Sequence, residues 1–258
     1  MSFNRFIIVG ILLLCLASCS NNSSNQQDEL EDEIGSLADS IVHNAIQAHG
    51  GKNYENAHFS FDFRGMTYTF KIDGERFEYT RSQFIDDHNV LDVYSDAGLK
   101  RYVDDVEQEL SEEDAQKYSE SINSVIYFTI LPYKLNDSAV NKEYLGNTTI
   151  KGKVYDVVKV TFDQHGGGTD YQDEYCYWFD IHNHYMDYLA YNFQENGGGA
   201  RFRAAYNQRE VGGIRFQDYV NYKADPEIPL ENLAKLYEQD KLELLSMIAN
   251  ENVKNLDD

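Results

Sequence analysis

The sequence contains little cysteine, and this scarcity limits how the chain can be cross-linked. Of its three cysteines, Cys15 and Cys19 lie near the N-terminus, so Cys176 stands alone in the rest of the chain. A disulfide within that part is therefore excluded. Cys176 has a tyrosine on each side, and we expect it to be a small buried apolar residue. No lysine or arginine close to it in the sequence would lower its pKa and make the thiol reactive.

Basic residues are also scarce. The chain has 22 lysines and arginines against 44 aspartates and glutamates, a formal net charge of −22. A surface this acidic repels nucleic acid and anionic lipid headgroups, so we expect no nucleic-acid partner. Aromatic residues make up 14% of the chain, which argues for a folded core and against a large disordered tract.

The familiar catalytic and cofactor motifs are missing. There is no Gly-x-Ser-x-Gly elbow, no His-Glu-x-x-His and no dinucleotide fingerprint. The glycine runs Gly166–Gly168 and Gly197–Gly199 lack the P-loop lysine, and we expect each to make a turn between strands. The acidic stretch 104–114 lacks the central glycine of an EF-hand. We therefore assign no catalytic residue and no cofactor, and favour a non-catalytic protein over an enzyme.

One set of polar residues could suggest a metal or catalytic site: His165, Asp170, Asp173, His182 and His184. A His-x-His pair can present two metal ligands, and carboxylates could complete the site. The pair lies at a predicted hairpin turn, however, where exposed polar residues are expected in any case. We expect no metal site, and an envelope hydrolase that uses these loop residues stays open as an alternative.

Long hydrophobic runs are absent except at the N-terminus. The run Phe6–Leu16 follows Arg5 and is about 11 residues long, too short to span a bilayer and typical of a signal peptide. The small residues and cysteine that follow, Ala17-Ser18-Cys19, resemble the bacterial lipobox, whose cysteine is acylated. We predict a signal peptide over 1–18, a lipid on Cys19, a polar and acidic tether over 19–33, and a single folded domain over 34–258.

Two segments have the apolar spacing of helices. The first, Ile34–His49, is followed by Gly50-Gly51, a typical helix end. His49 lies in its last turn, where the helix dipole favours a cation, and we prefer this explanation to a metal-ligand role. The second helix is predicted over Ser111–Leu131, with a serine cap and acidic residues in its first turn.

Other segments alternate with a period of two, as strands do. Phe59, Phe61 and Phe63 alternate with polar residues, and the alternation resumes in a new phase after Arg64-Gly65, which indicates a bulge or tight bend. A second series over 154–222 has glycine-rich turns at close spacing, so the sheet is predicted to be antiparallel. The pattern of 242–253 fits either a helix or a strand, and we favour a closing strand.

Short patches and the order of these elements carry a resemblance to a known fold. The patches are Ala48-His-Gly-Gly51 followed by Phe59–Arg64, and Tyr177-Trp-Phe-Asp180 followed by a turn and a strand. They resemble uncharacterised Gram-negative envelope lipoproteins with the LolA- and LolB-like lipoprotein-carrier fold. The resemblance implies an α+β protein, in which a strongly curved antiparallel half-barrel packs with an N-terminal and a central helix over an apolar cavity.

The predicted function follows from that cavity. We expect a lipid or other apolar ligand to bind there, and the candidate lining residues are Phe61, Phe63, Tyr175, Tyr177, Phe179, Phe202 and Phe216. The acylated Cys19 would tether the protein to a membrane of the cell envelope, with the outer membrane favoured. Besides the hydrolase, a structural or interaction subunit of a surface complex stays open. The ligand, the leaflet, the oligomeric state and protein partners are left undetermined.

Overall fold

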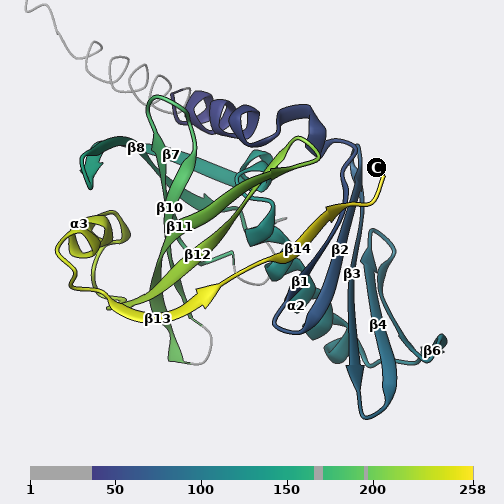
Figure 1. Ribbon diagram of the computed structural model, residues 1–258. Coiled ribbons are helices and arrows are strands. Elements are labelled where there is room, and N and C mark those ends of the chain that lie inside the picture. Colours follow the sequence, from purple (N-terminus) through teal and green to yellow (C-terminus); the bar gives the residue numbers. More distant parts are fainter. Residues whose placement is uncertain (1–36, 166–170, 195–196, 258) are drawn as a thin grey trace, which may run out of the picture.

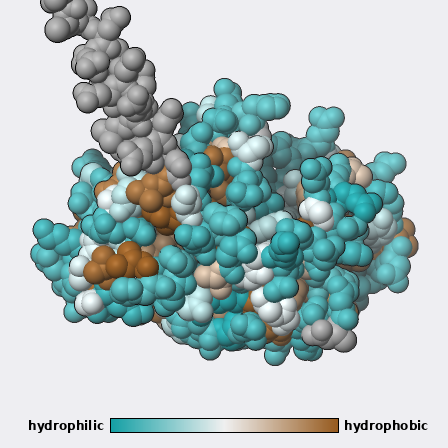
Figure 2. Space-filling model, turned by 90° about the horizontal axis from the view of Figure 1, so that it is seen from above, coloured by the Kyte–Doolittle hydropathy of each residue, from teal (hydrophilic) through white to brown (hydrophobic). Residues whose placement is uncertain are grey.

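The computed structural model describes residues 37–165, 171–194 and 197–257 (Figure 1). The predicted signal peptide, the lipidated Cys19 and the tether over 19–33 lie outside these residues, so they stay predictions. Among the described helices, none is both long enough and apolar enough to cross a membrane. The space-filling view shows a largely hydrophilic upper face with small, separate hydrophobic patches (Figure 2).

The first sheet, here called sheet A, is a meander of hairpins. Its described strands are ordered β14-β1-β2-β3-β4-β5-β6. The predicted bend after Phe63 is a tight turn in which Arg64 and Gly65 both have positive φ, 52° and 76°. The strands of sheet A are β1 (His58–Phe63), β2 (Met66–Asp73), β3 (Arg76–Ile85), β4 (His88–Ser95), β5 (Gly98–Val103), β6 (Val106–Gln108) and β14 (Glu251–Asn255).

The second sheet, sheet B, is also antiparallel throughout. Its described strands are ordered β13-β12-β11-β10-β9-β8-β7, so neighbours in the sheet are neighbours along the chain. The predicted antiparallel pairing is therefore confirmed. The strands are β7 (Val140–Ile150), β8 (Lys153–Phe162), β9 (Tyr175–Asp180), β10 (Met186–Phe193), β11 (Gly199–Val211), β12 (Ile214–Ala224) and β13 (Glu243–Ile248).

The two sheets are joined where the chain passes from β13 to β14. The predicted closing strand over 242–253 is a strand, but it breaks at 249–250 and pairs with β12 on one side and β1 on the other (Figure 1). The buried carboxylate of Asp218 holds this junction. It accepts hydrogen bonds from the Asn250 N–H (3.0 Å), Arg209 Nη1 (3.1 Å) and Asn207 Nδ2 (2.6 Å). The predicted curved half-barrel is confirmed as two open sheets that are joined where the chain passes from β13 to β14.

The helices cover different faces of the sheets. The N-terminal helix, residues 37–49, packs on one face of sheet B, with Ala38, Val42 and Ala45 against its strands. Helix α3 (Leu233–Glu238), after the short η4 (Leu230–Asn232), packs on the opposite face of sheet B. Two further short 3-10 helices among the described residues are η1 (Gly51–Tyr54) and η2 (Tyr133–Asn136).

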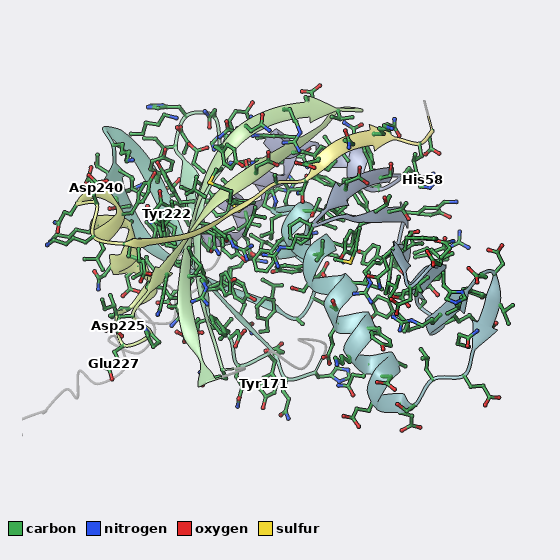
Figure 3. All side chains as sticks on the ribbon, turned by 60° about the horizontal axis from the view of Figure 1, so that its bottom comes forward. His58, Tyr171, Tyr222, Asp225, Glu227 and Asp240 are labelled. Carbon is green, nitrogen blue, oxygen red and sulfur yellow. The ribbon has the colours of Figure 1, made fainter. Side chains whose placement is uncertain are left out.

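Helix α2 (Glu112–Thr129) is the predicted central helix. It begins as expected, with the Ser111 hydroxyl accepting a hydrogen bond from the Asp114 N–H (3.1 Å). Its Ile122 and Ile126 are fully buried against the aromatic face of sheet A. Figure 3 shows α2 between the strands of sheet A and those of sheet B, so this helix has a second side available to sheet B.

His49 differs from the prediction in its charge. The expectation that the helix dipole favours a cation is wrong, because burial, helped by nearby Arg215, lowers the pKa of His49 to about 3. The neutral ring accepts a hydrogen bond through Nε2 from the Met186 N–H (3.1 Å). The histidine therefore ties the end of the N-terminal helix to β10.

Candidate ligand pocket

A pocket of about 350 Å³ lies between α2 and sheet B. One wall is the second half of α2, and the opposite wall is built from β9 to β13. The turn after β1 contributes at the side. The residues that line the pocket are Phe63, Arg64, Ser124, Val125, Phe128, Thr129, Asp173, Tyr175, Tyr191, Phe193, Arg201, Arg203, Tyr219, Ile248 and Asn250.

Strand pairing explains why aromatic rings gather on this wall. Tyr175 on β9, Tyr191 on β10 and Arg201 on β11 are direct cross-strand partners, so their side chains lie in one row on the same face. The rings of Tyr175 and Tyr191 stack with 5.5 Å between centroids. Phe128 closes over them from α2, with 5.4 Å between its ring centroid and that of Tyr191. This wall thus presents stacked aromatic rings beside an arginine.

Arg203 is the most unusual group in the pocket. It is only 8% exposed, and its guanidinium carbon lies 4.0 Å from the ring centroid of Phe128 and 5.0 Å from that of Tyr191. Its Nη2 donates to Tyr191 Oη (2.8 Å), whereas its buried Nε has no hydrogen-bond partner. Among the ion pairs of the described residues, none includes Arg203.

Two further arginines line the pocket, and both lie over aromatic rings. The guanidinium carbon of Arg201 is 4.7 Å from the ring centroid of Phe193, and that of Arg64 is 5.0 Å from the centroid of Phe63. Asp173 is a buried carboxylate on the same lining. Three arginines and one aspartate leave the lining formally positive in a chain whose net charge is −22.

The lining offers hydrogen-bond donors. Burial raises the pKa of the Tyr219 phenol to about 12, so this group stays protonated and can donate. Histidine is absent from the described lining. His182 and His184 lie in the turn between β9 and β10, and His165 follows β8, so the described histidines of the hydrolase alternative do not reach the pocket.

The other parts of the polar cluster are placed as follows. Asp173 lines the pocket, and Asp170 lies outside the described residues. Within the part of the chain that the structure covers, no three histidine, cysteine, aspartate or glutamate side chains are grouped to hold a metal ion. Cys176 is buried among apolar residues on the far face of sheet B, as predicted, and burial raises the pKa of its thiol.

The seven predicted lining residues are divided by the structure. Phe63 and Tyr175 line the pocket. The other five are fully buried in packed clusters instead. Phe61 and Phe216 lie in the core between sheet A and α2, and Tyr177 and Phe179 in the core under the N-terminal helix. Phe202 packs on the opposite face of sheet B, towards α3.

Sequence reasoning missed the arginines and several aromatic residues that do line the pocket, including Phe128 and Tyr191. One signal for the arginines was present in the sequence. Arg201 and Arg203 flank Phe202 on one strand, and successive side chains of a strand point to opposite faces. Placing Phe202 in a core therefore places both arginines on the other face. A choice of lining residues by hydropathy alone favours Phe202 over the charged Arg201 and Arg203.

Two solved structures share this architecture. A DUF1329 family protein from Desulfovibrio piger aligns with a TM-score of 0.50 at 9% identity, covering 86% of this chain and 93% of that chain. A LolA superfamily protein from Nitrosomonas europaea aligns with a TM-score of 0.50 at 12% identity, covering 84% of this chain and 93% of that chain. At such low identity these similarities concern the fold alone, and they confirm the predicted LolA-like architecture.

Sequence comparison assigns the family. No curated protein matches the chain. Residues 6–250, nearly the whole sequence, match the family described as "Family of unknown function (DUF6503)". The protein therefore belongs to the DUF6503 family, and its fold is that of the LolA-like half-barrels.

Proposed function

We propose that this protein is a non-catalytic binding protein of the cell envelope, which holds a lipid or other apolar ligand between α2 and sheet B. The observation that carries the proposal is the aromatic-lined pocket of about 350 Å³. Small-molecule pockets span roughly 300–1,000 Å³ and combine apolar walls with polar groups that fix the ligand, and this pocket has that size and joins aromatic with polar lining residues. A filled space between α2 and sheet B would have favoured the interaction-subunit alternative.

The energetic basis is the removal of apolar surface from water. Each Å² of apolar area that a ligand buries contributes roughly 25 cal/mol. The stacked rings of Tyr175 and Tyr191 offer a rigid surface for this purpose, so the protein loses little conformational entropy when the ligand binds. The hydrolase alternative gains no support, since the described lining holds no histidine.

Anchoring at the envelope completes the proposal and rests on the N-terminal sequence. Two or three acyl chains on Cys19, at about 0.8 kcal/mol per buried methylene, would hold the protein on a membrane almost permanently. Cys19→Ser should abolish acylation. Metabolic labelling with a radioactive fatty acid measures this, and equal label in variant and wild type would contradict the lipoprotein assignment.

Ligand binding can be tested with the neutral apolar fluorophore Nile red. The chain from residue 19 onward, produced without acylation, should bind the dye near stoichiometrically, and long-chain lipids should displace it. Phe63→Glu places a charge on the pocket lining and should abolish binding. The matched control is Phe84→Glu at a hairpin end, where the side chain is 71% exposed, and it should bind normally. No dye binding by the wild type, or equal binding by both variants, contradicts the proposal.

A further inference from the structure

Arg203 has an energetic deficit that the protein alone does not correct. A buried charge is costly unless it is paired and hydrogen-bonded. The guanidinium is 8% exposed, makes its one described hydrogen bond to Tyr191, and leaves Nε without a partner. Its contacts with the rings of Phe128 and Tyr191 offset only part of this cost. An anion in the pocket would satisfy the remaining donors.

The neighbouring residues also favour an anion in the pocket. Arg201 lies two residues along the same strand and therefore on the same face, and Arg64 approaches from the turn after β1. Even with Asp173 counted, the lining has a formal excess of positive charge. The chain as a whole has twice as many acidic as basic residues. The acidic surface repels anions generally, while this small region attracts them.

We propose that the pocket selects a single-chain amphiphile with an anionic head, whose carboxylate or phosphate binds Arg203 and Arg201 while its chain lies on the aromatic wall. This inference rests on the proposed binding function and specifies its ligand. A guanidinium fork matches both carboxylate and phosphate oxygens in a bidentate geometry. A volume of about 350 Å³ lies near the lower end of the range for ligand pockets, which favours one chain over several.

The competing explanation is that Arg203 serves packing alone, through its aromatic contacts. The chain offers a matched control for that explanation. Arg215 on β12 also stacks on a tyrosine, with 3.7 Å from its guanidinium carbon to the ring centroid of Tyr185, and its Nε is likewise buried without a partner. Arg215 does not line the pocket. A loss of binding that is specific to Arg203 therefore reports contact with the ligand.

The experiment measures displacement of Nile red from the unacylated chain by four probes: oleate, oleyl alcohol, a single-chain oleoyl phosphate lipid and acetate. Oleate should bind the wild type at least about tenfold more tightly than the alcohol, and acetate should not displace the dye. Arg203→Met should weaken oleate roughly 10- to 100-fold and leave the alcohol unchanged, since a hydrogen bond to a charged group is lost. Arg215→Met should change neither. Whichever of oleate and the phosphate lipid binds with the higher affinity identifies the preferred anionic head group.

Several outcomes would overturn the inference. Equal affinity for oleate and oleyl alcohol in the wild type would contradict the preference for an anionic head, while the proposed function would stand. Equal losses in Arg203→Met and Arg215→Met would assign Arg203 to packing. Displacement by acetate as strong as by oleate would show that the acyl chain of the ligand plays no part in binding. If no probe binds at all, the proposed function itself fails. Should Arg203→Met fail to fold, the less buried Arg201→Met replaces it and must reduce the preference for oleate.

Discussion

Helix α2 contacts arginines of both sheets, Arg81 and Arg101 on sheet A and Arg203 on sheet B, and they differ in whether a carboxylate pairs with them. On sheet A, Arg81 and Arg101 both bind the fully buried Asp92: Arg81 Nη2 lies 2.7 Å from Oδ2, and Arg101 Nε lies 2.6 Å from Oδ1. Arg81 also donates to Ser121 of α2 (3.0 Å). On sheet B, Arg203 contacts the rings of α2 and β10 and no described carboxylate.

This difference separates arginines that are paired within the fold from one that has unpaired donors at the proposed ligand pocket. The guanidinium groups on sheet A are satisfied by Asp92 and Ser121, so they fix α2 in place and have little left to offer a ligand. The group on sheet B is equally buried but remains unsatisfied. An unsatisfied buried group that lines a pocket calls for an explanation, and a bound anion is one. Measurements of stability for variants at Asp92, Arg81 and Arg203 can contradict this distinction.

The largest effect is expected from Asp92→Ala. This change leaves the buried Arg81 and the half-buried Arg101 without their carboxylate, and breaking a buried ion pair costs about 3–5 kcal/mol of unfolding free energy. Urea denaturation measures the loss. The control is Asp73→Ala, which removes an exposed pair with Arg76 and should cost less than about 1 kcal/mol. Similar costs at the two sites would mean that the Asp92 network does not hold the fold.

The next largest effect on the free energy of unfolding is expected when the same substitution is made at Arg81 and at Arg203 and the two variants are compared. Arg81→Met breaks hydrogen bonds to Asp92 and Ser121 and should cost about 2–3 kcal/mol. Arg203→Met leaves no carboxylate behind and removes an incompletely satisfied buried charge together with its ring contacts, so without ligand the free energy of unfolding should change by less than about 1 kcal/mol. Thermal unfolding compares them. A greater loss at Arg203 would show that its role is structural.

His49 extends the comparison to a buried group that stays neutral. Its pKa is about 3 in the folded protein and near 6.5 when unfolded, so the unfolded state binds the extra proton between these values. Stability from this group is therefore complete above pH 6.5 and falls as the pH decreases, by about 1.4 kcal/mol per unit. Between pH 6.5 and 5 the loss is about 2 kcal/mol. His49→Gln should remove this dependence in urea denaturation; an unchanged slope would contradict it.

The smallest effect is expected at the turn histidines, which lie away from both arginine sets. His182 is exposed, and His184 has a positive φ of 61° that asparagine tolerates. The double variant His182→Ala, His184→Asn should therefore change stability by less than about 0.5 kcal/mol and leave Nile red binding intact. Stoichiometric zinc in the wild type, lost in this variant, would instead revive the metal-dependent hydrolase.

The sequence predicted the elements well where apolar residues were regularly spaced. The alternation of Phe59 and Phe61 and the serine cap of α2 both correspond to observed elements. Strand β7 was missed because it is an edge strand whose middle residues are only partly buried, so its apolar pattern is weak. The dipole argument for His49 failed because burial outweighs a helix terminus, and burial is not visible in the local sequence.

The pocket was only partly predictable for a related reason. Period-two alternation places Tyr175, Tyr177 and Phe179 on one face of β9, and the structure agrees. Which part of that face stays uncovered depends on where the helices lie. The N-terminal helix covers Tyr177 and Phe179, whereas the end of α2 lies near Tyr175. Residues with identical patterns thus become core or lining.

The antiparallel α+β class, the faces of the strands and the acidic surface could be predicted from the sequence, because they depend on residue spacing and composition. Which cations share a site depends on the folded structure. Arg81, Asp92 and Arg101 meet because β3, β4 and β5 are adjacent in register, with Asp92 directly opposite both arginines. Arg203 contacts the ring of Phe128, which belongs to α2, and has no described carboxylate partner. Pairing of buried charges depends on three-dimensional proximity, which no local pattern in a chain specifies.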